Sequence, residues 1–196
     1  VLRERAGLTQ EDRVIAYGGR ITTARGIEET IAALPHLDDD VHFVLLGYGE
    51  AAALEDVTEQ AHAHGVEHRV HLIGAVAPDE VSRALADGDV AVVHVRPICL
   101  SYRYALPNKL FESIRAGLPI ASADLPDMRA VVEELGVGEV FQGSSSRDLA
   151  DALRAILQRP DRYQAAARAA APHLTWERET DQMLEMYRGV LRAQGR

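Results

Sequence analysis

The chain has 196 residues, of which 47% are hydrophobic and 26% are charged, so it is long enough to bury one sizeable core. Its formal net charge of -9 argues against a protein that binds nucleic acid through the phosphate backbone, because such proteins carry a basic surface. No apolar run reaches the length of a membrane span, and the first residues lack the apolar stretch of a signal peptide. We therefore expect a cytoplasmic protein that holds any bound anion with a small local group of cations.

Two residue types occur once each at positions that matter for the chemistry. Cys99 is the only cysteine, which excludes an internal disulfide, and no cluster of metal ligands accompanies it. Among the 21 Lys and Arg residues, Lys109 is the only lysine. The sequence therefore predicts no metal site, and the surroundings of Lys109 become a place to look for a function.

Short apolar segments alternate with segments of helical periodicity along the whole chain. The apolar segments predict strands at 14–17, 41–46, 69–73, 89–95, 119–122 and 138–141. The segments between and after them predict helices at 27–37, 51–64, 78–86, 107–116, 127–135, 146–157, 159–171 and 176–193. Apolar strands separated by helices indicate a parallel sheet that is covered on both faces. The predicted fold is α/β and Rossmann-like: a single domain of about six parallel strands with a C-terminal helix.

The loop after the first predicted strand contains paired glycines and two arginines. Gly18 and Gly19 precede Arg20, and Arg25 follows five residues later. Ligands bind at the carboxyl ends of parallel strands, where glycine lets the backbone come close and guanidinium groups can clamp a diphosphate. A tight turn with two solvated arginines explains this segment equally well.

Two further loops and one histidine give weaker indications. The segment 47–49 lacks the third glycine and the acidic residue of a dinucleotide fingerprint, so we interpret it as a turn. The small apolar segment 73–76 suits either a flat ring or ordinary loop packing. The histidines lack the spacing of a zinc hydrolase, and only His94, near a strand end, is expected near a ligand.

The segment between the fourth predicted strand and the next helix carries the strongest prediction. The helix is expected to begin near Pro107, which leaves the amides of Asn108, Lys109 and Leu110 free at its N-terminus. The helix dipole favours an anion there, and Lys109 adds a full charge. Glu112, one turn further, is placed to accept hydrogen bonds from sugar hydroxyls. The alternative is a capped helix with a solvated lysine and glutamate.

In this order the motifs resemble the C-terminal, donor-binding half of retaining glycosyltransferases of the group 1 family, which have the GT-B fold. The resemblance covers about residues 8–193. It is carried by YGGR at 17–20, RG at 25–26, LGYG at 46–49, HLIG at 71–74, PNKLFE at 107–112 and AGLPI at 116–120. It implies transfer of a hexosyl group from a UDP- or GDP-linked sugar to a glycan, lipid or small molecule, without a cofactor or metal.

The resemblance also implies roles for individual residues. It assigns stabilisation of the leaving diphosphate to Arg20, Arg25 and Lys109. It assigns donor binding to Gly19, Ile73, Gly74, Ala75, Val76, Tyr104, Ala105, Leu106, Asn108, Leu110 and Glu112, of which 73–76 hold the nucleobase and Glu112 the ribose. Tyr104 stands where the family usually has a glutamate that contacts the donor sugar. Because tyrosine supplies no carboxylate, that sugar contact is expected to differ here.

The length implies one half of a GT-B enzyme, which needs two domains of this size. We expect an interdomain linker at 1–12, the nucleotide-sugar-binding domain at 13–174, and a helix at 175–196 that packs on a missing N-terminal, acceptor-binding domain. Alone, the chain is expected to bind nucleotide without transferring sugar, and the uncovered surface to dimerise or stay exposed. The parent enzyme is expected to be cytoplasmic and peripheral at the membrane.

Two other functions stay open at this point. One is a non-catalytic nucleotide- or phosphate-binding module that acts through a partner chain. The other is a fragment of a sugar-nucleotide epimerase with the GT-B fold, whose acid and base residues would lie across the domain cleft. A nicotinamide dehydrogenase fits least, because no three-glycine fingerprint follows the first strand.

Overall fold

A computed structural model describes residues 1–143 and 145–194, which contain one six-stranded parallel sheet. The strand order is β3-β2-β1-β4-β5-β6. The strands are β1 (Arg13–Ile21), β2 (Val41–Gly49), β3 (Val70–Leu72), β4 (Val90–Val93), β5 (Ile120–Ala123) and β6 (Gly138–Phe141). The chain reverses its direction across the sheet between β1 and β4, which is where open parallel sheets bind ligands. The prediction of a Rossmann-like α/β fold is confirmed.

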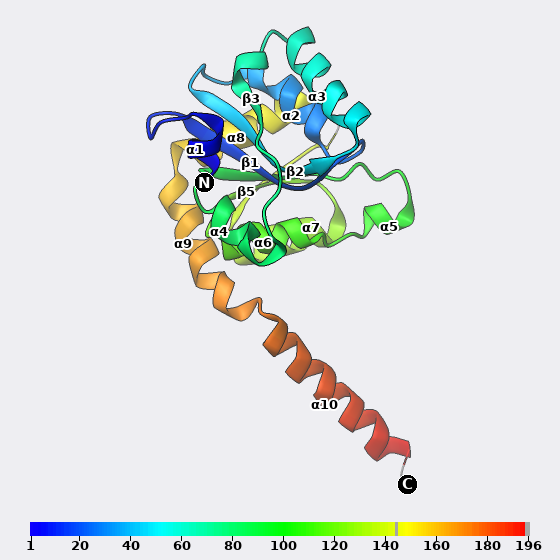
Figure 1. The fold of residues 1–196 in the computed structure, drawn as a ribbon. Coiled ribbons are helices and arrows are strands. Elements are labelled where there is room, and N and C mark those ends of the chain that lie inside the picture. Colours follow the sequence, from blue (N-terminus) through cyan, green and yellow to red (C-terminus); the bar gives the residue numbers. More distant parts are fainter. Residues whose placement is uncertain (144, 195–196) are drawn as a thin grey trace.

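Helices cover both faces of the sheet (Figure 1). One face carries α2 (Ile27–Ala33), α3 (Ala51–Ala63) and α8 (Ser146–Gln158). The other carries α4 (Val81–Leu85), α6 (Asn108–Arg115) and α7 (Pro126–Leu135), with α9 (Pro160–Ala170) packed against α6 and α7. Every residue of β4 and β5 is buried, which explains why these strands are apolar or small throughout.

The first strand is longer than its sequence predicts. A glycine loop is expected after Tyr17, but the pairing of β1 with β2 continues until Ile21 lies opposite Gly49. Gly19 lies opposite Gly47, and a Cβ atom on Gly47 would stand only 1.8 Å from the carbonyl oxygen of Gly19. The glycines therefore allow close pairing of two backbones, and the expectation of a loop at this point is wrong.

Proline and element length account for the other differences. The helix predicted at 27–37 stops at Ala33 and continues as the 3-10 helix η1 (Leu34–His36), because Pro35 has no amide hydrogen to donate. The helix predicted at 78–86 divides in the same way into η3 (Pro78–Glu80) and α4. The short helices α1 (Leu2–Ala6) and α5 (Leu100–Arg103) and the 3-10 helices η2 (Glu67–Arg69) and η4 (Ala171–His173) are too short to show a periodicity.

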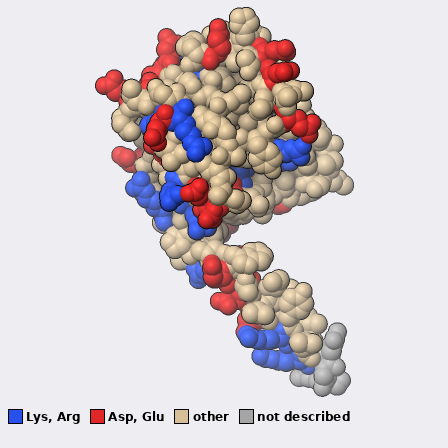
Figure 2. Space-filling view, in the orientation of Figure 1, with Lys and Arg blue, Asp and Glu red and all other residues tan. Residues whose placement is uncertain are grey.

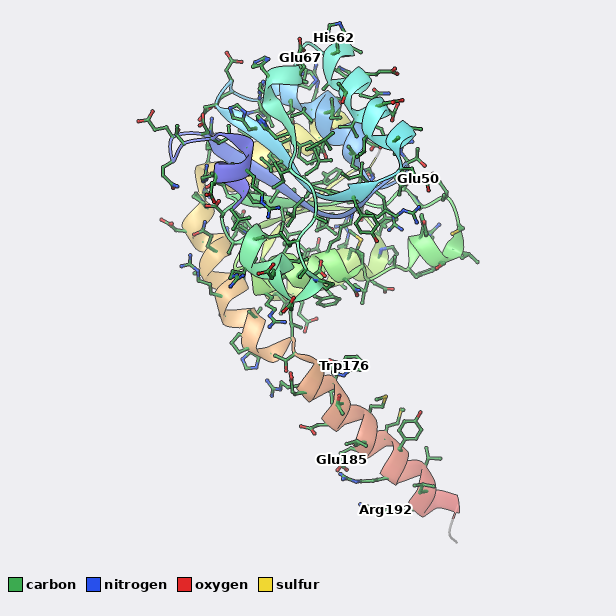
Figure 3. The ribbon with its side chains drawn as sticks, in the orientation of Figure 1. Glu50, His62, Glu67, Trp176, Glu185 and Arg192 are labelled. Carbon is green, nitrogen blue, oxygen red and sulfur yellow. The ribbon has the colours of Figure 1, made fainter. Side chains whose placement is uncertain are left out.

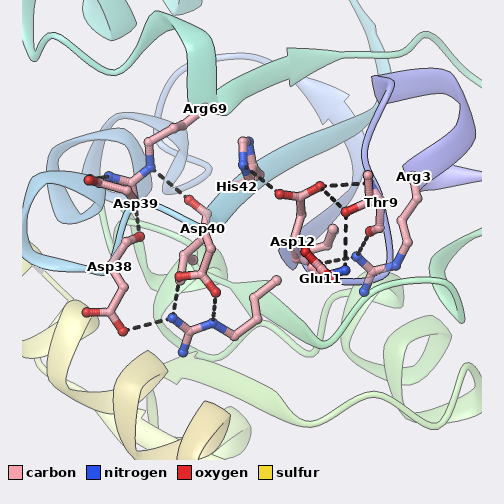
Figure 4. Close-up of polar contacts among 12 residues, drawn as sticks. Arg3, Thr9, Glu11, Asp12, Asp38, Asp39, Asp40, His42 and Arg69 are labelled. Atoms are coloured by element: carbon pink, nitrogen blue, oxygen red, sulfur yellow. Dashed lines mark hydrogen bonds and ion pairs between the residues drawn. The ribbon is translucent and has the colours of Figure 1, made fainter.

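Polar contacts hold the N-terminal segment, residues 1–12, on the domain. Arg3 is buried, pairs with Asp89 at 2.7 Å, and donates hydrogen bonds to the carbonyl oxygens of Thr9 (3.1 Å) and Asp12. The Asp12 carboxylate accepts from the amide of Thr9 and lies 3.6 Å from His42 on β2 (Figure 4). Residues 1–12 therefore pack on the domain, while their role as an interdomain linker stays a prediction.

The last helix, α10 (Trp176–Gln194), extends away from the body of the molecule (Figure 1). Figure 3 shows Trp176 at its start and Glu185 and Arg192 further along it. Residues 181–192 are all exposed, including six large apolar side chains: Met183, Leu184, Met186, Tyr187, Val190 and Leu191. Their spacing of three and four residues forms an uncovered apolar stripe.

Charged side chains of both signs lie on the surface of the molecule (Figure 2). On the face shown in Figure 2, acidic and basic side chains are interspersed on the body, and both signs also occur on α10. None of the helices in residues 1–143 and 145–194 combines the length and the apolar composition that a bilayer crossing requires.

Candidate functional site

A hollow of about 270 Å³ lies at the carboxyl edge of the sheet, between the end of β1 and the start of α6. It is lined by Tyr17, Gly18, Gly19, Arg20, Arg25, Pro107, Asn108, Lys109 and Glu112. We call it the switch-point pocket, since β1 and β4, the strand that leads to α6, are neighbours at the reversal of strand order. The fold thus brings together all three predicted cations with three of the predicted donor-binding residues.

Lys109 forms part of the lining of the switch-point pocket although it is nearly buried, with 8% of its surface exposed. Its Nζ donates to the carbonyl oxygens of His94 (3.0 Å) and Arg25 (3.4 Å) and lies 4.7 Å from the ring centroid of Tyr17. These partners are neutral, so they solvate the ammonium without neutralising it. Burial, with a smaller contribution from the Arg25 charge, lowers the pKa of Lys109 to about 7. A bound anion would favour the charged form of this side chain.

The N-terminus of α6 offers backbone donors beside this ammonium. Pro107 is the N-cap, in extended conformation, and no side chain caps the helix. The first amides, those of Asn108 and Lys109, have no carbonyl partner within the helix. The amide of Leu110 donates to the carbonyl of Pro107 at 2.9 Å, and the Leu110 side chain lies in the core. Asn108 and Lys109 line the pocket, and the predicted donor contact of Leu110 stays a prediction.

The two arginines of the pocket have different surroundings. The guanidinium of Arg25 lies 5.2 Å from the ring centroid of Tyr102, and its Nη2 is 3.5 Å from the Tyr102 hydroxyl. Arg20 is 57% exposed and pairs with Glu50 at 3.0 Å, which Figure 3 shows at the start of α3. Exposed pairs of this kind contribute only about 0–1 kcal/mol, so Arg20 is free to exchange Glu50 for a phosphate.

Glu112 connects the switch-point pocket to a second hollow of about 430 Å³, which is also lined by Asn108, Pro78, Asp79 and Ser82. Burial raises the pKa of the Glu112 carboxyl above its usual value. The second hollow adjoins the segment that follows β3, because Pro78 and Asp79 are separated from residues 73–76 by Ala77 alone. A ligand that fills both hollows therefore passes Asn108 and Glu112, which line both.

Several predicted residues lie outside both hollows. The segment that follows β3 at the same edge of the sheet does not line either hollow; it consists of Ile73, Gly74, Ala75 and Val76. Its Gly74 carbonyl accepts a hydrogen bond from the amide of Gly47 at 2.9 Å. The loop of Tyr104, Ala105 and Leu106, in which Tyr104 is 55% exposed, also lines neither hollow. Their donor contacts stay predictions. His94 is fully buried behind the pocket and reaches it through its carbonyl oxygen.

Sequence reasoning missed two aromatic residues of the site. Tyr17 lies under the Lys109 ammonium and its hydroxyl donates to the carbonyl of Arg20 at 2.7 Å, so it supports both cations. Tyr102 carries the contacts of Arg25. From the sequence, Tyr17 is expected to be an ordinary core residue of a strand, and Tyr102 a loop residue. Only the tertiary fold places their rings beside cations. Among the described residues, no three His, Cys, Asp or Glu side chains are grouped as metal ligands.

A doubly wound parallel sheet with a cationic pocket at its switch point defines the class of phosphate- and nucleotide-binding α/β domains. Within this class, the family model described as glycosyl transferases group 1 matches residues 1–173. The chain therefore belongs to the group 1 glycosyltransferase family, and its fold is one Rossmann-like half of a GT-B enzyme. The resemblance of the sequence motifs to this family is confirmed.

Individual relatives show how much of the family's architecture is present. A D-inositol 3-phosphate glycosyltransferase of Xylanimonas cellulosilytica is 31% identical in an alignment of 195 residues that covers 95% of this chain and 44% of the relative. Anabaena HepE in complex with UDP has a TM-score of 0.82 at 19% identity, over 96% of this chain and 51% of HepE. The C-terminal domain of the Francisella tularensis group 1 protein LpcC has a TM-score of 0.62 at 17% identity, over 85% and 87% of the two chains. The chain thus spans about half the length of the first two.

Proposed function

We propose that this chain is the donor-binding domain of a retaining glycosyltransferase that uses a nucleotide-diphosphate sugar. The observation that carries the proposal is the position of Lys109: a nearly buried ammonium with only neutral partners lines a pocket at the switch point. Such a charge is costly unless an anion completes the site. The UDP complex of HepE and the activity named for the Xylanimonas relative support a nucleotide sugar as the ligand.

The arrangement of the two hollows supports one orientation of the bound nucleotide sugar. The diphosphate lies in the switch-point pocket, between Arg25 and the N-terminus of α6. Glu112 accepts hydrogen bonds from the ribose hydroxyls, because it stands where the two hollows meet. The nucleobase then lies toward residues 73–76 and the second hollow. In this pose, the donor sugar extends from the diphosphate on the side opposite the nucleoside.

The chemistry that these residues support is departure of a diphosphate. The bond between the anomeric carbon and the β-phosphate oxygen breaks, and negative charge develops on the leaving group. Arg20, Arg25 and Lys109, with the dipole of α6, stabilise that charge. The acceptor hydroxyl attacks from the face that the diphosphate leaves and gives its proton to a phosphate oxygen, so the anomeric configuration is retained. No metal ion is required in this scheme.

Transfer also needs an acceptor site, which we assign to a second domain. The uncovered apolar stripe on α10 supports this, because a stripe of this kind normally packs on another surface. We therefore expect the 196-residue chain to bind the nucleotide of the donor without transferring sugar, and we expect the acceptor-binding domain to cover α10 in the whole enzyme. Self-association through α10 is the alternative outcome for the isolated chain.

Isothermal titration calorimetry with UDP, GDP and ADP tests the proposed function. We expect one of these nucleotides to bind, and Arg25→Ala and Lys109→Ala each to weaken that binding by about tenfold or more, since each removes a charge-assisted contact of roughly 1.5–3 kcal/mol. Arg188→Ala is the matched control, because Arg188 pairs with Glu185 on α10, far from the pocket. Absence of binding by all three nucleotides, or binding indifferent to both site variants, contradicts the proposal.

A further inference from the structure

The loop that carries Arg25 has an unusual backbone. Ala24 has a φ of 62°, the only positive φ of a residue other than glycine in the described part of the chain. Gly26, the N-cap of α2, has a φ of 81°. Left-handed conformations at a residue with a Cβ atom persist only where the surrounding structure holds them. The neighbours of residues 24–26 therefore determine where Arg25 lies.

The segment beyond β4 supplies those neighbours. The Arg96 amide donates to the carbonyl of Ala24 at 3.1 Å, and the Arg96 guanidinium bonds to the Glu29 carboxylate in the first turn of α2. His94, two residues earlier, places its Nδ1 3.7 Å from the other Glu29 oxygen. The packing is close, because a Cβ atom on Gly26 would stand 2.2 Å from the Cβ of His94. His94 and Arg96 thus hold the start of α2 at Glu29.

Burial of the His94 imidazole costs free energy that a purely structural role does not require. The imidazole is fully buried beside Phe141, and neither ring nitrogen has a hydrogen-bond partner among the described residues, nor does the Glu29 Oε2 that faces it. Burial, opposed by the Glu29 charge, lowers the pKa of His94 to about 4, so the ring is neutral at pH 7. An apolar side chain of similar size would avoid the loss of hydration. Stability alone therefore does not explain a histidine here.

We propose that His94 and Glu29 are positioning residues for the diphosphate site: the imidazole packs against Gly26 and lies 3.7 Å from the Glu29 Oε2, so it restricts the position of this carboxylate, and with it the start of α2 and the Arg25 loop. This inference rests on the proposed function. The carbonyl of His94 also accepts a hydrogen bond from Lys109. One residue thereby sets the positions of both cations, through its side chain for Arg25 and through its backbone for Lys109. Only the first of these depends on the imidazole.

The test separates stability from nucleotide binding. His94→Leu is expected to leave the melting temperature equal or higher, and to weaken binding of UDP, or of GDP if that nucleotide binds, by about tenfold, a free-energy change of roughly 1.4 kcal/mol. In an Arg25→Ala background the same substitution is expected to cause no further loss, because His94 acts through Arg25. Binding is followed by NMR titration, which also measures the millimolar affinities of the double variant.

Two further variants complete the test. His71→Leu on β3 is the control for loss of a partly buried histidine outside the pocket, and is expected to leave affinity unchanged. His94→Gln keeps a polar side chain beside Glu29 and is expected to retain most of the affinity. Equal losses from His94→Leu with and without Arg25, or no loss in His94→Leu, would overturn the positioning role alone. If His94→Leu does not fold, a loss in His94→Gln as large as that in Arg25→Ala would overturn it. A wild-type chain that binds neither nucleotide would overturn the proposed function and this inference with it.

Discussion

Lys109 combines three properties that rarely occur together: burial, a full positive charge at low pH, and neutral polar partners. Its pKa of about 7 means that the ammonium exists in only part of the molecules at physiological pH. A diphosphate that binds beside it raises this pKa, so binding takes up a proton when the pH is above 7. This linkage distinguishes a buried phosphate-binding lysine from a solvated one.

The pH dependence of nucleotide affinity follows from this linkage. As the pH rises from 6 to 9, the affinity of the wild-type chain is expected to fall relative to that of Lys109→Arg, by up to about tenfold per pH unit above 7, because the guanidinium stays charged. Calorimetry measures both proteins with the same nucleotide at each pH. Because the titration of the nucleotide affects both affinities equally, it cancels in their ratio. A ratio of affinities that stays constant across this range contradicts the assignment of Lys109.

At the residue level, the sequence predicts the parts of the site that depend on local structure. The sequence predicts Lys109 and Glu112 as site residues because a proline, a helix start and a spacing of one turn occur in one segment. Tyr17 and His94 act through contacts with residues that are distant in sequence, with the Lys109 ammonium above Tyr17 and with Glu29 beside His94. Side-chain identity gives no indication of such contacts.

At the level of elements, the loop between β1 and α2 is the part of the fold on which the site depends most. Its left-handed residues and its contact with His94 make it sensitive to changes that other turns tolerate. The six strands and most of the helices follow from apolar runs and periodicity. The extension of β1 through Gly19 does not, because a pair of glycines indicates a turn in isolation and a close strand pairing only when Gly47 lies opposite.

Gly26→Ala tests the packing of this loop against a matched control. We expect it to lower the free energy of unfolding by about 2–4 kcal/mol, because the new Cβ is strained at positive φ and collides with His94. Gly136→Ala, at the C-cap of α7, has a similar φ of 63° but open space around it, so its cost is expected to be about 1 kcal/mol. Urea denaturation measures both, and equal costs would show that the contact with His94 is unimportant.

At the level of the whole molecule, the chain is a folded domain with one element left uncovered. The core of the sheet and its helices is closed without α10, whose residues 181–192 are exposed. Family membership and the length of the relatives support a second domain as the partner of this helix. Under this proposal, the surface that meets the stripe belongs to another segment of chain, so its residues do not follow from this sequence.

Removal of the exposed part of α10 tests this view of the domain. A chain that ends at Thr180 keeps Trp176, which lines the second hollow, and removes the exposed residues 181–192 of α10. It is expected to keep its melting temperature within about 2 °C and its nucleotide affinity, since residues 181–192 bury little surface on the body. It is also expected to stay monomeric in size-exclusion chromatography, including at concentrations where an exposed stripe promotes association of the 196-residue chain. A fall in melting temperature of more than about 5 °C would show that α10 belongs to the fold of this domain.

The most direct measurement of the central claim is a crystal structure of the chain with UDP or GDP, whichever binds in solution. The account predicts diphosphate density in the switch-point pocket, within hydrogen-bond distance of Lys109, Arg25 and the first amides of α6, with the ribose hydroxyls on Glu112. Density for the nucleotide in another part of the molecule, or a pocket that excludes the diphosphate while the nucleotide is bound, would contradict it.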